Sequence, residues 1–260
     1  MANTHTETVI DQFTRQAAAF TALPIHSDGE AMELCLSLVK LSRDDIVLDV
    51  ACGPGILACS MAHTAHQVDG LDVTPAMLEQ ARLRQQNEGV TNVSWYLGNG
   101  LNLPFSDSSY SLVTSRYAFH HMPEPGAILA EMRRVCTEDG RIMIIDVTPT
   151  EAAQTDYDNL ERLRDPSHVR ALTEQQLLQL ASSQELTLMS QAKYRLDVGL
   201  EQQIAASAMT PNEIAKIRQL LTKDADLGVD SHGLSARYEG PAIYVSYPIS
   251  VFIFSLDARK

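Results

Sequence analysis

A turn of small residues follows an apolar strand, and the residue types in this turn could bind a ligand. Residues 46–55 read IVLDVACGPG, so an apolar run carries Asp49 and leads into a turn that contains Gly53 and Gly55. Small residues let a ligand approach the backbone closely, and the N–H groups at the start of a following helix attract negative charge. A second carboxylate, Asp72, follows the apolar run at residues 67–71. The sequence therefore predicts a ligand site at this turn.

The same turn also fits a dinucleotide-binding pattern, because residues 53–58 read GPGILA and Asp72 lies 17 positions beyond Gly55. That pattern expects the apolar strand to lead directly into its first glycine. Here Asp49 would fall in the last part of the strand, where an unpaired buried carboxylate is costly. Asp49 better suits a strand that ends near it, with the carboxylate at the sheet edge facing a cation. A nicotinamide-dependent dehydrogenase is therefore the less favoured alternative.

Two adjacent histidines, His120 and His121, follow another apolar run at residues 110–115. They would lie at the carboxyl edge of the sheet, where open α/β sheets bind their ligands. Histidine can take up a proton near neutral pH, so one of them could act as a general base. Adjacent side chains diverge, and we expect at most one to face the site. His168 is a comparable candidate, and the alternative for all three is a purely structural bond to the backbone.

Short β-branched runs alternate with longer amphipathic stretches, and this alternation positions the residues above. The expected strands are residues 45–50, 67–71, 93–97, 110–115 and 140–147, and the expected helices between them are 56–65, 75–87 and 126–136. This order is typical of βαβ units and a mostly parallel sheet. After residue 147 we expect helices at 172–185, 200–208 and 211–223 and strands at 186–196 and 242–256. The late helices are excursions from one sheet, so the sequence predicts a single doubly wound α/β domain.

Composition narrows the possible partners. Of the 260 residues, 45% are hydrophobic and 20% are charged, which is typical of a folded globular chain. The formal net charge of −13 would repel phosphate backbones and anionic headgroups, so we expect neither nucleic acid binding nor membrane insertion. The four cysteines form neither a dense disulfide framework nor paired zinc ligands. We therefore expect a cytoplasmic protein without a bound metal.

The glycine turn and its neighbours resemble a known enzyme family. Residues 49–55, with the pattern D-x-A-x-G-x-G, resemble motif I of the class I S-adenosylmethionine-dependent methyltransferases. Residues 68–78 are similar to that family's second strand with its ribose-binding acid, and residues 98–105 to its adenine-side segment. The histidine pair and residues 131–147 continue the similarity. The subgroup that it most resembles includes the ubiquinone and menaquinone methyltransferases and related small-molecule methyltransferases.

This resemblance implies a Rossmann-like methyltransferase fold, which is a doubly wound, mostly parallel seven-stranded sheet with a helical lid and cap. Residues 1–42 would form the lid, residues 43–148 the cofactor-binding core, and residues 149–260 the cap inserts and final strands. S-adenosyl-L-methionine would be the methyl donor, and a small organic molecule would be methylated on O, N or C. The alternatives are a non-methylating reaction of a protein that binds this cofactor, such as a cyclisation, and a ligand-binding regulator.

The resemblance also implies which residues act in catalysis and which bind the cofactor. His121 would lie beside the acceptor and assist the removal of its proton. Asn99 stands where relatives usually carry Asp, but its side-chain carbonyl can still accept a hydrogen bond from the adenine amino group. The residues expected to bind the cofactor are Phe20, Asp49, Ala51, Gly53, Gly55, Asp72, Val73, Met77, Asn99, Gly100, Leu101 and Arg116.

Overall fold

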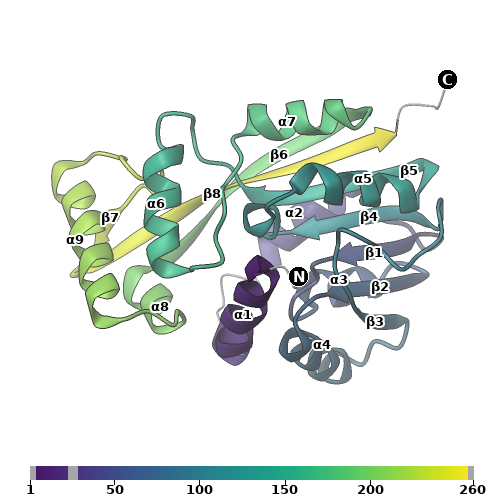
Figure 1. The fold of residues 1–260 in the computed structure, drawn as a ribbon, viewed down its shortest axis with the longest axis horizontal. Helices are drawn as coiled ribbons and strands as arrows, with labels where there is room; N and C mark the ends of the chain where they lie inside the picture. The colour runs from purple at the N-terminus through teal and green to yellow at the C-terminus, as the bar shows by residue number, and fades with distance from the viewer. Residues whose placement is uncertain (1–3, 23–28, 257–260) are drawn as a thin grey trace.

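The computed structural model describes residues 4–22 and 29–256 of the chain, and one sheet runs through all of this part (Figure 1). The strands follow the order β3-β2-β1-β4-β5-β8-β6, and β7 pairs with β8 beside this path. Their bounds are β1 (Ile46–Val50), β2 (Gln67–Asp72), β3 (Val93–Leu97), β4 (Tyr110–Arg116), β5 (Cys136–Val147), β6 (Leu186–Gly199), β7 (Arg237–Glu239) and β8 (Ala242–Leu256).

Helices cover both faces of this sheet. They are α1 (Thr4–Ala22), α2 (Gly29–Val39), α3 (Ile56–Ala62), α4 (Pro75–Glu88), α5 (Pro125–Val135), α6 (Gln154–Arg164), α7 (Glu174–Ser183), α8 (Leu200–Ala205) and α9 (Pro211–Leu227), with a short 3₁₀ helix η2 (Phe119–His121). None of the described helices is both long and apolar enough to span a membrane.

The predicted fold class is confirmed. Strands β3, β2, β1, β4 and β5 pair in parallel, and only the later strand β8 runs antiparallel to its neighbours β5 and β6. The path holds the seven strands that were expected, and the short β7 adds an eighth. The strand order reverses between β1 and β4, and ligands of such sheets bind outside the carboxyl ends at this reversal.

The core lies in two layers, one on each face of the sheet. Leu57 and Met61 of α3 pack on one face, and Leu129 and Met132 of α5 pack on the other, all with at most 2% of their surface exposed. Because both faces are covered, the central strands are continuous apolar runs and not alternating ones. This is why the central strands β1, β2, β4 and β5 were recognisable from the sequence, whereas the edge strand β3 exposes Tyr96 and Leu97.

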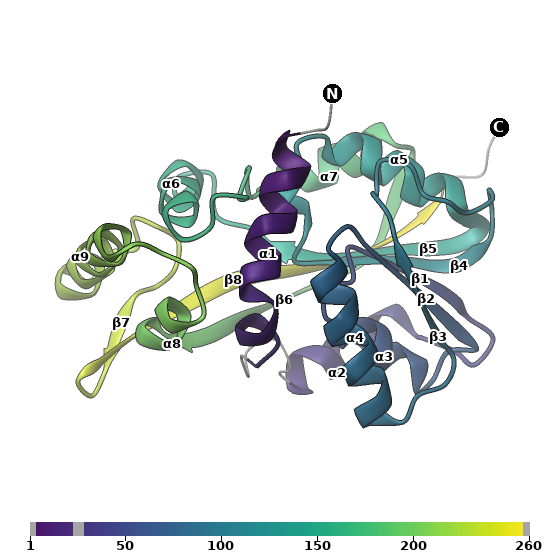
Figure 2. The same ribbon diagram turned by 60° about the horizontal axis from the view of Figure 1, so that its bottom comes forward.

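Strands β6 and β8 extend the sheet beyond its parallel part. The pairing of β5 with β8 ends at Val147 and Ile249, whereas β6 continues along β8 as far as Gly199 and Tyr244. Helices α6, α8 and α9 gather around this extension (Figure 1). Helix α1 crosses the carboxyl edge of the sheet between the extension and α4 (Figure 2). The space at this edge is therefore bounded by elements from both ends of the chain.

Candidate functional site

The turn between β1 and α3 has an unusual backbone. Ala51, Gly53 and Gly55 all have positive φ angles, of 57°, 53° and 74°. This left-handed region suits glycine but is uncommon for a residue with a Cβ, so Ala51 stores some conformational strain. The N–H of Cys52 donates to the carbonyl of Leu71 in β2 and fixes the turn beside the neighbouring strand. The backbone of the turn is thereby exposed toward the sheet edge.

Gly53 and Gly55 serve different purposes in this turn. Gly53 lines a cavity, and a Cβ added to it would meet nothing within 4 Å. A Cβ added to Gly55 would lie 2.6 Å from the ring of Trp95 and 3.0 Å from the Cβ of Ala81. Gly55 is not among the residues that line the cavity. Its place in the motif is therefore explained by the close packing of α3 against α4 and β3.

The cavity at this turn has a volume of about 180 Å³ and lies at the carboxyl ends of β1, β2 and β4. Helix α1 forms one wall through His5, Thr6, Val9 and Phe13. Phe20 also belongs to α1, but its side chain lies outside the described part of the chain. We call this space the donor cavity, because the sequence predicts that the methyl donor binds at this turn. The other predicted site residues that line it are Asp49, Ala51, Gly53, Asp72, Val73, Met77, Asn99, Gly100, Leu101, Arg116 and His121.

Two buried carboxylates give the donor cavity its electrostatic character. Asp72 accepts hydrogen bonds from the N–H groups of Gly53 at 2.9 Å and Thr74 at 2.8 Å, so it joins the turn to the start of α4. Asp49 accepts from the hydroxyl of Thr114 at 3.0 Å. Burial raises the pKa of Asp72, and burial with the nearby Asp72 charge raises the pKa of Asp49 to about 7. A bound cation would stabilise both carboxylates in their charged form.

The lining of the cavity also includes a neutral amide, Asn99, and a cation, Arg116. The side-chain oxygen of Asn99 accepts a hydrogen bond from the N–H of Leu101 at 3.0 Å, which stabilises the loop after β3. Arg116 lies at the end of β4, with its guanidinium 4.4 Å from the centre of the Tyr117 ring. Tyr117 has a φ angle of 55° and its hydroxyl lies 2.6 Å from that of Tyr194 in β6. Arg116 thus brings a positive charge to the lining of the cavity.

A second cavity adjoins the donor cavity and shares Phe13, Tyr117 and His121 with it. It lies between the sheet and the extension made by α6, α8 and β8, and we call it the acceptor cavity. Most of the residues that line it were not predicted from the sequence, because they come from elements without a recognisable motif. The remaining lining residues are Gln16, His120, Val147, Tyr157, Glu161, Arg164, Asp165, Leu196, Gln203, Ala206, Ser207, Tyr247 and Ile249.

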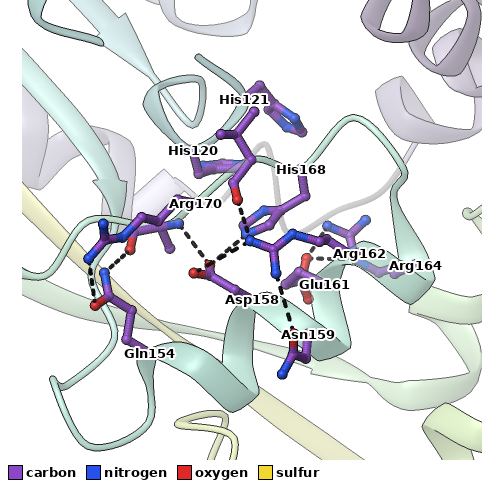
Figure 3. Close-up of polar contacts among 12 residues, drawn as sticks. His120, His121, Gln154, Asp158, Asn159, Glu161, Arg162, Arg164, His168 and Arg170 are labelled. Atoms are coloured by element: carbon purple, nitrogen blue, oxygen red, sulfur yellow. Dashed lines mark hydrogen bonds and ion pairs between the residues drawn. The ribbon is translucent and has the colours of Figure 1, made fainter. Parts of the chain in front are cut away.

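The three candidate histidines lie close together but have different partners (Figure 3). The rings of His120 and His121 are 4.3 Å apart, and that of His168 lies 5.6 Å from His120. The Nδ1 of His121 donates to the carbonyl of Ser167 at 3.1 Å, and its own carbonyl accepts from His5 at 2.8 Å. Burial and the neighbouring His120 lower the pKa of His121 to about 3. His121 is thus a neutral imidazole at the junction of the two cavities.

The other two histidines each pair with an aspartate. The Nδ1 of His120 lies 2.6 Å from Oδ1 of Asp146, and the Nε2 of His168 lies 2.7 Å from Oδ1 of Asp158. His168 is 4% exposed and lines neither cavity, so its arrangement fits a structural role. His120 lines the acceptor cavity. Asp146 is a partner that the sequence did not reveal, because it lies 26 positions away.

The donor cavity fits the cofactor that the sequence implies. In the described chain, neither Asp49 nor Asp72 forms a salt bridge within 4 Å, although the charge of Arg116 acts on Asp49, so two buried carboxylates face the cavity. A Cβ added to Gly100 would lie 3.3 Å from side-chain atoms of Ile128 and Val50, so a larger residue in the loop after β3 would require these side chains to shift. S-adenosylmethionine carries a sulfonium, a ribose with two hydroxyls and a carboxylate. These groups match the carboxylates and the arginine of this cavity.

Comparisons with known proteins agree with this geometry. Residues 48–144 match the family described as a methyltransferase domain. An uncharacterized methyltransferase, YcgJ of Bacillus subtilis, is 28% identical over 89% of this chain and 92% of its own length. The crystal structure of YcgJ covers 88% of this chain and 99% of that chain, with 25% identity and a TM-score of 0.79.

A second relative is similar over less than half of either chain. The ubiquinone/menaquinone biosynthesis C-methyltransferase UbiE of Desulfotalea psychrophila is 34% identical over 40% of this chain and 42% of its own length. Together with the strand order, the turn after β1 and the carboxylates at the sheet edge, these matches assign the chain. Residues 48–144 form a methyltransferase domain, and the chain is an S-adenosylmethionine-dependent methyltransferase with the class I fold.

Proposed function

We propose that this enzyme methylates a small organic molecule that reaches the methyl donor through the acceptor cavity. The observation that carries this proposal is the wall that the two cavities share, made of Phe13, Tyr117 and His121. A donor in one cavity and an acceptor in the other would meet at this wall. Holding two reactants in line at such a junction can contribute about 7 to 11 kcal/mol to lowering the barrier.

The residues of the donor cavity would bind and orient the cofactor. Bound S-adenosylmethionine supplies an electrophilic methyl group on a positively charged sulfur. Asp72 would accept hydrogen bonds from the ribose hydroxyls, and the Asn99 oxygen would accept one from the adenine amino group. Arg116 would hold the carboxylate, and the buried charge of Asp49 would favour a cationic ligand. Helix α1 would exclude water by covering the cavity with His5, Thr6, Val9 and Phe13.

His121 would contact the acceptor at the junction. Because its pKa is low, its imidazole stays neutral throughout the ordinary pH range. The hydrogen bond from its Nδ1 to Ser167 leaves Nε2 as a hydrogen-bond acceptor. His121 would therefore accept a hydrogen bond from the hydroxyl or N–H of the acceptor and orient it for methyl transfer. With a pKa of about 3, it would not itself hold the proton that the acceptor loses.

The proposal also assigns roles to the three parts of the chain. Residues 1–42 would act as a lid, residues 43–148 as the cofactor-binding core, and residues 149–260 as the cap that selects the acceptor. The cysteines Cys35, Cys52, Cys59 and Cys136 are all free and buried, which supports a reducing compartment such as the cytoplasm.

Two measurements test the proposed function. Calorimetric titration with S-adenosylmethionine and with NADH should show binding of the first only, and the reverse result would favour the dehydrogenase. Incubation with radiolabelled methyl donor and a panel of phenols, amines and carbon acids should then transfer label to at least one acceptor. Tight binding of the methyl donor without transfer to any member would favour a non-methylating reaction or a regulatory role.

A further inference from the structure

Helix α1 lines both cavities with residues of one face. Val9 lines the donor cavity, Gln16 lines the acceptor cavity, and Phe13 between them lines both. Residues at these spacings lie on the same face of a helix. The face of α1 that would cover the methyl donor therefore continues over the acceptor, and there it presents the polar side chain of Gln16.

The side chain of Gln16 has a hydrogen-bond donor without a partner. It is 3% exposed, and its Nε2 has no hydrogen-bond partner among the described residues. Such a buried donor is costly, and most are satisfied in native proteins. Gln12, one helical turn earlier, is 1% exposed and its Nε2 also lacks a partner there, but Gln12 lines neither cavity. Of the two, only Gln16 can receive its partner from a molecule in the acceptor cavity.

The charges of the acceptor cavity favour an uncharged partner for this donor. Both cationic side chains of the lining already have a carboxylate beside them, because Arg164 pairs with Glu161 and His120 pairs with Asp146. Asp165 adds a further carboxylate to the lining. An anionic acceptor would therefore meet excess negative charge, whereas a neutral oxygen could accept from Gln16 without that cost.

The rest of the lining suits a largely apolar molecule. Several of its residues are apolar or aromatic, namely Phe13, Val147, Tyr157, Leu196 and Ile249. The ring of Phe13 meets that of His121 edge to face, with their centres 5.1 Å apart. In ligand sites of this kind the apolar walls bury the body of the ligand, and a few polar groups fix its orientation.

These observations rest on the proposed function and deepen it. We infer that Gln16 is a specificity-determining residue, whose Nε2 donates a hydrogen bond to an uncharged oxygen of the acceptor, as in a ketone, an ester or an amide. His121 would accept a hydrogen bond from the group that is methylated. The acceptor thus carries two polar groups on an apolar body, and a molecule without the uncharged oxygen leaves Gln16 unpartnered and binds more weakly.

The first test compares two probes of nearly the same shape. One is 4′-fluoroacetophenone, an aryl ketone, and the other is 4-fluoro-α-methylstyrene, in which a CH₂ group replaces the carbonyl oxygen. Their Kd values are measured by ¹⁹F NMR on protein saturated with S-adenosylhomocysteine. Gln16→Met keeps the length of the side chain without its N–H, so it should weaken ketone binding about threefold or more and leave binding of the hydrocarbon unchanged. Gln16→Glu replaces the donor by a charged acceptor and should weaken ketone binding about tenfold or more.

Gln12→Met is the matched control, because it removes an unpartnered buried amide of the same helix outside both cavities, and it should change neither Kd. The inference is overturned if wild type does not bind the ketone, or if folded Gln16→Met binds it as tightly as wild type does. A third probe, 4-fluorobenzoate, carries a negative charge and should bind wild type about tenfold or more weakly than the ketone. Equal or tighter binding of 4-fluorobenzoate would contradict the assignment of an uncharged oxygen.

The melting temperature without ligand distinguishes recognition from a structural role. Gln16→Met and Gln12→Met each remove a buried donor without a partner, so each should raise the melting temperature by about 2 to 4 °C. A lower melting temperature for Gln16→Met than for wild type would mean that this amide already stabilises the protein without ligand, and it would count against the inference.

The design separates this inference from the proposed function. Calorimetric binding of S-adenosylhomocysteine is measured on every variant before the probes are added. If wild type does not bind it, the proposed function fails. If binding is intact but the probes or the melting temperature give a contradicting result, the inference fails alone and the methyltransferase assignment stands.

Discussion

Asp72 and Gly55 both contribute to the turn after β1, but they have separable roles. Asp72 touches both the turn after β1 and the start of α4, and it also faces the donor cavity. Gly55 faces Trp95 and Ala81 and not the cavity. A substitution at Gly55 would therefore disturb packing, whereas one at Asp72 would remove a group within reach of the cofactor. The sequence motif alone does not separate the two roles, because the same short turn lines the cavity and packs against the neighbouring elements.

Replacing Asp72 should weaken cofactor binding. Hydrogen bonds to a charged group contribute about 1.5 to 3 kcal/mol, so Asp72→Ala should raise the Kd of S-adenosylmethionine roughly ten- to a few hundred-fold. Asp45→Ala is a suitable control, because Asp45 is equally buried but binds Ser111 and Arg141 at the opposite edge of the sheet. It should lower stability without changing affinity. Equal calorimetric affinities for folded Asp72→Ala and wild type would exclude the ribose assignment.

Asn99 offers a test of adenine recognition. If its oxygen receives the adenine amino group, Asn99→Asp should preserve or tighten binding, because a charged acceptor makes the stronger hydrogen bond. Either acceptor can also keep the bond to the N–H of Leu101. Calorimetric titration gives the affinity, and thermal unfolding gives the integrity of the loop. Loss of binding with an unchanged unfolding curve would show that Asn99 has another role.

The sequence predicted the residues of the donor cavity much better than those of the acceptor cavity. Asp49 and Asp72 could be located because each lies at or next to the last residue of its strand, and parallel strands end at the same edge. The pairing of His120 with Asp146 arises because β4 and β5 are neighbours, and their relative register has no signature in the sequence. Gln16 reaches the cavity only because α1 crosses the sheet edge, and this crossing depends on tertiary packing.

At the scale of elements, the parallel strands were predicted almost to the residue. The prediction of 93–97 matches β3, and those of 67–71 and 110–115 each fall one residue short of β2 and β4. Strand β5 begins at Cys136, four residues before the predicted start, because its irregular first part pairs with Tyr110. Helix α3 ends at Ala62, three residues early. Burial on both faces makes strand interiors recognisable, but ends depend on pairing and capping.

Helix α1 should respond to cofactor binding. Four of its residues line the donor cavity, and His5 is joined to the carbonyl of His121. Saturation with S-adenosylhomocysteine should slow amide hydrogen exchange in residues 4–22 by about tenfold or more, equivalent to about 1.4 kcal/mol of added protection. Helix α9 lies beyond the acceptor cavity and serves as the internal control. Mass-spectrometric exchange with equal slowing in α1 and α9, or in neither, would contradict the covering role of α1.

At the scale of the whole molecule, one cavity contains two buried ionisable groups that have opposite effects on how stability depends on pH. The pKa of Asp49 is about 7 in the folded chain against 3.8 as its ordinary value, and that of His121 is about 3 against 6.5. Between about pH 4 and 6.5, folded Asp49 keeps a proton that the unfolded chain has lost, so this group makes stability fall as pH rises. Over the same range, unfolded His121 holds a proton that the folded chain lacks, so this group makes stability rise with pH.

Asp49 and His121 should therefore make opposite contributions to the slope of the free energy of unfolding against pH. These contributions should offset each other in wild type and appear separately in single variants. Each is at most about 1.4 kcal/mol per pH unit. The His121→Gln variant keeps only the contribution of Asp49, so the free energy of unfolding of this variant should fall, relative to wild type, from pH 4.5 to 6.5. Asp49→Asn keeps an oxygen for Thr114 but leaves His121, so its free energy of unfolding should rise over that range. Urea denaturation at three pH values measures both, and the double variant should regain the wild-type slope. Identical slopes in the two single variants would mean that neither group is held in the buried state described here, because all other ionisable groups are common to both.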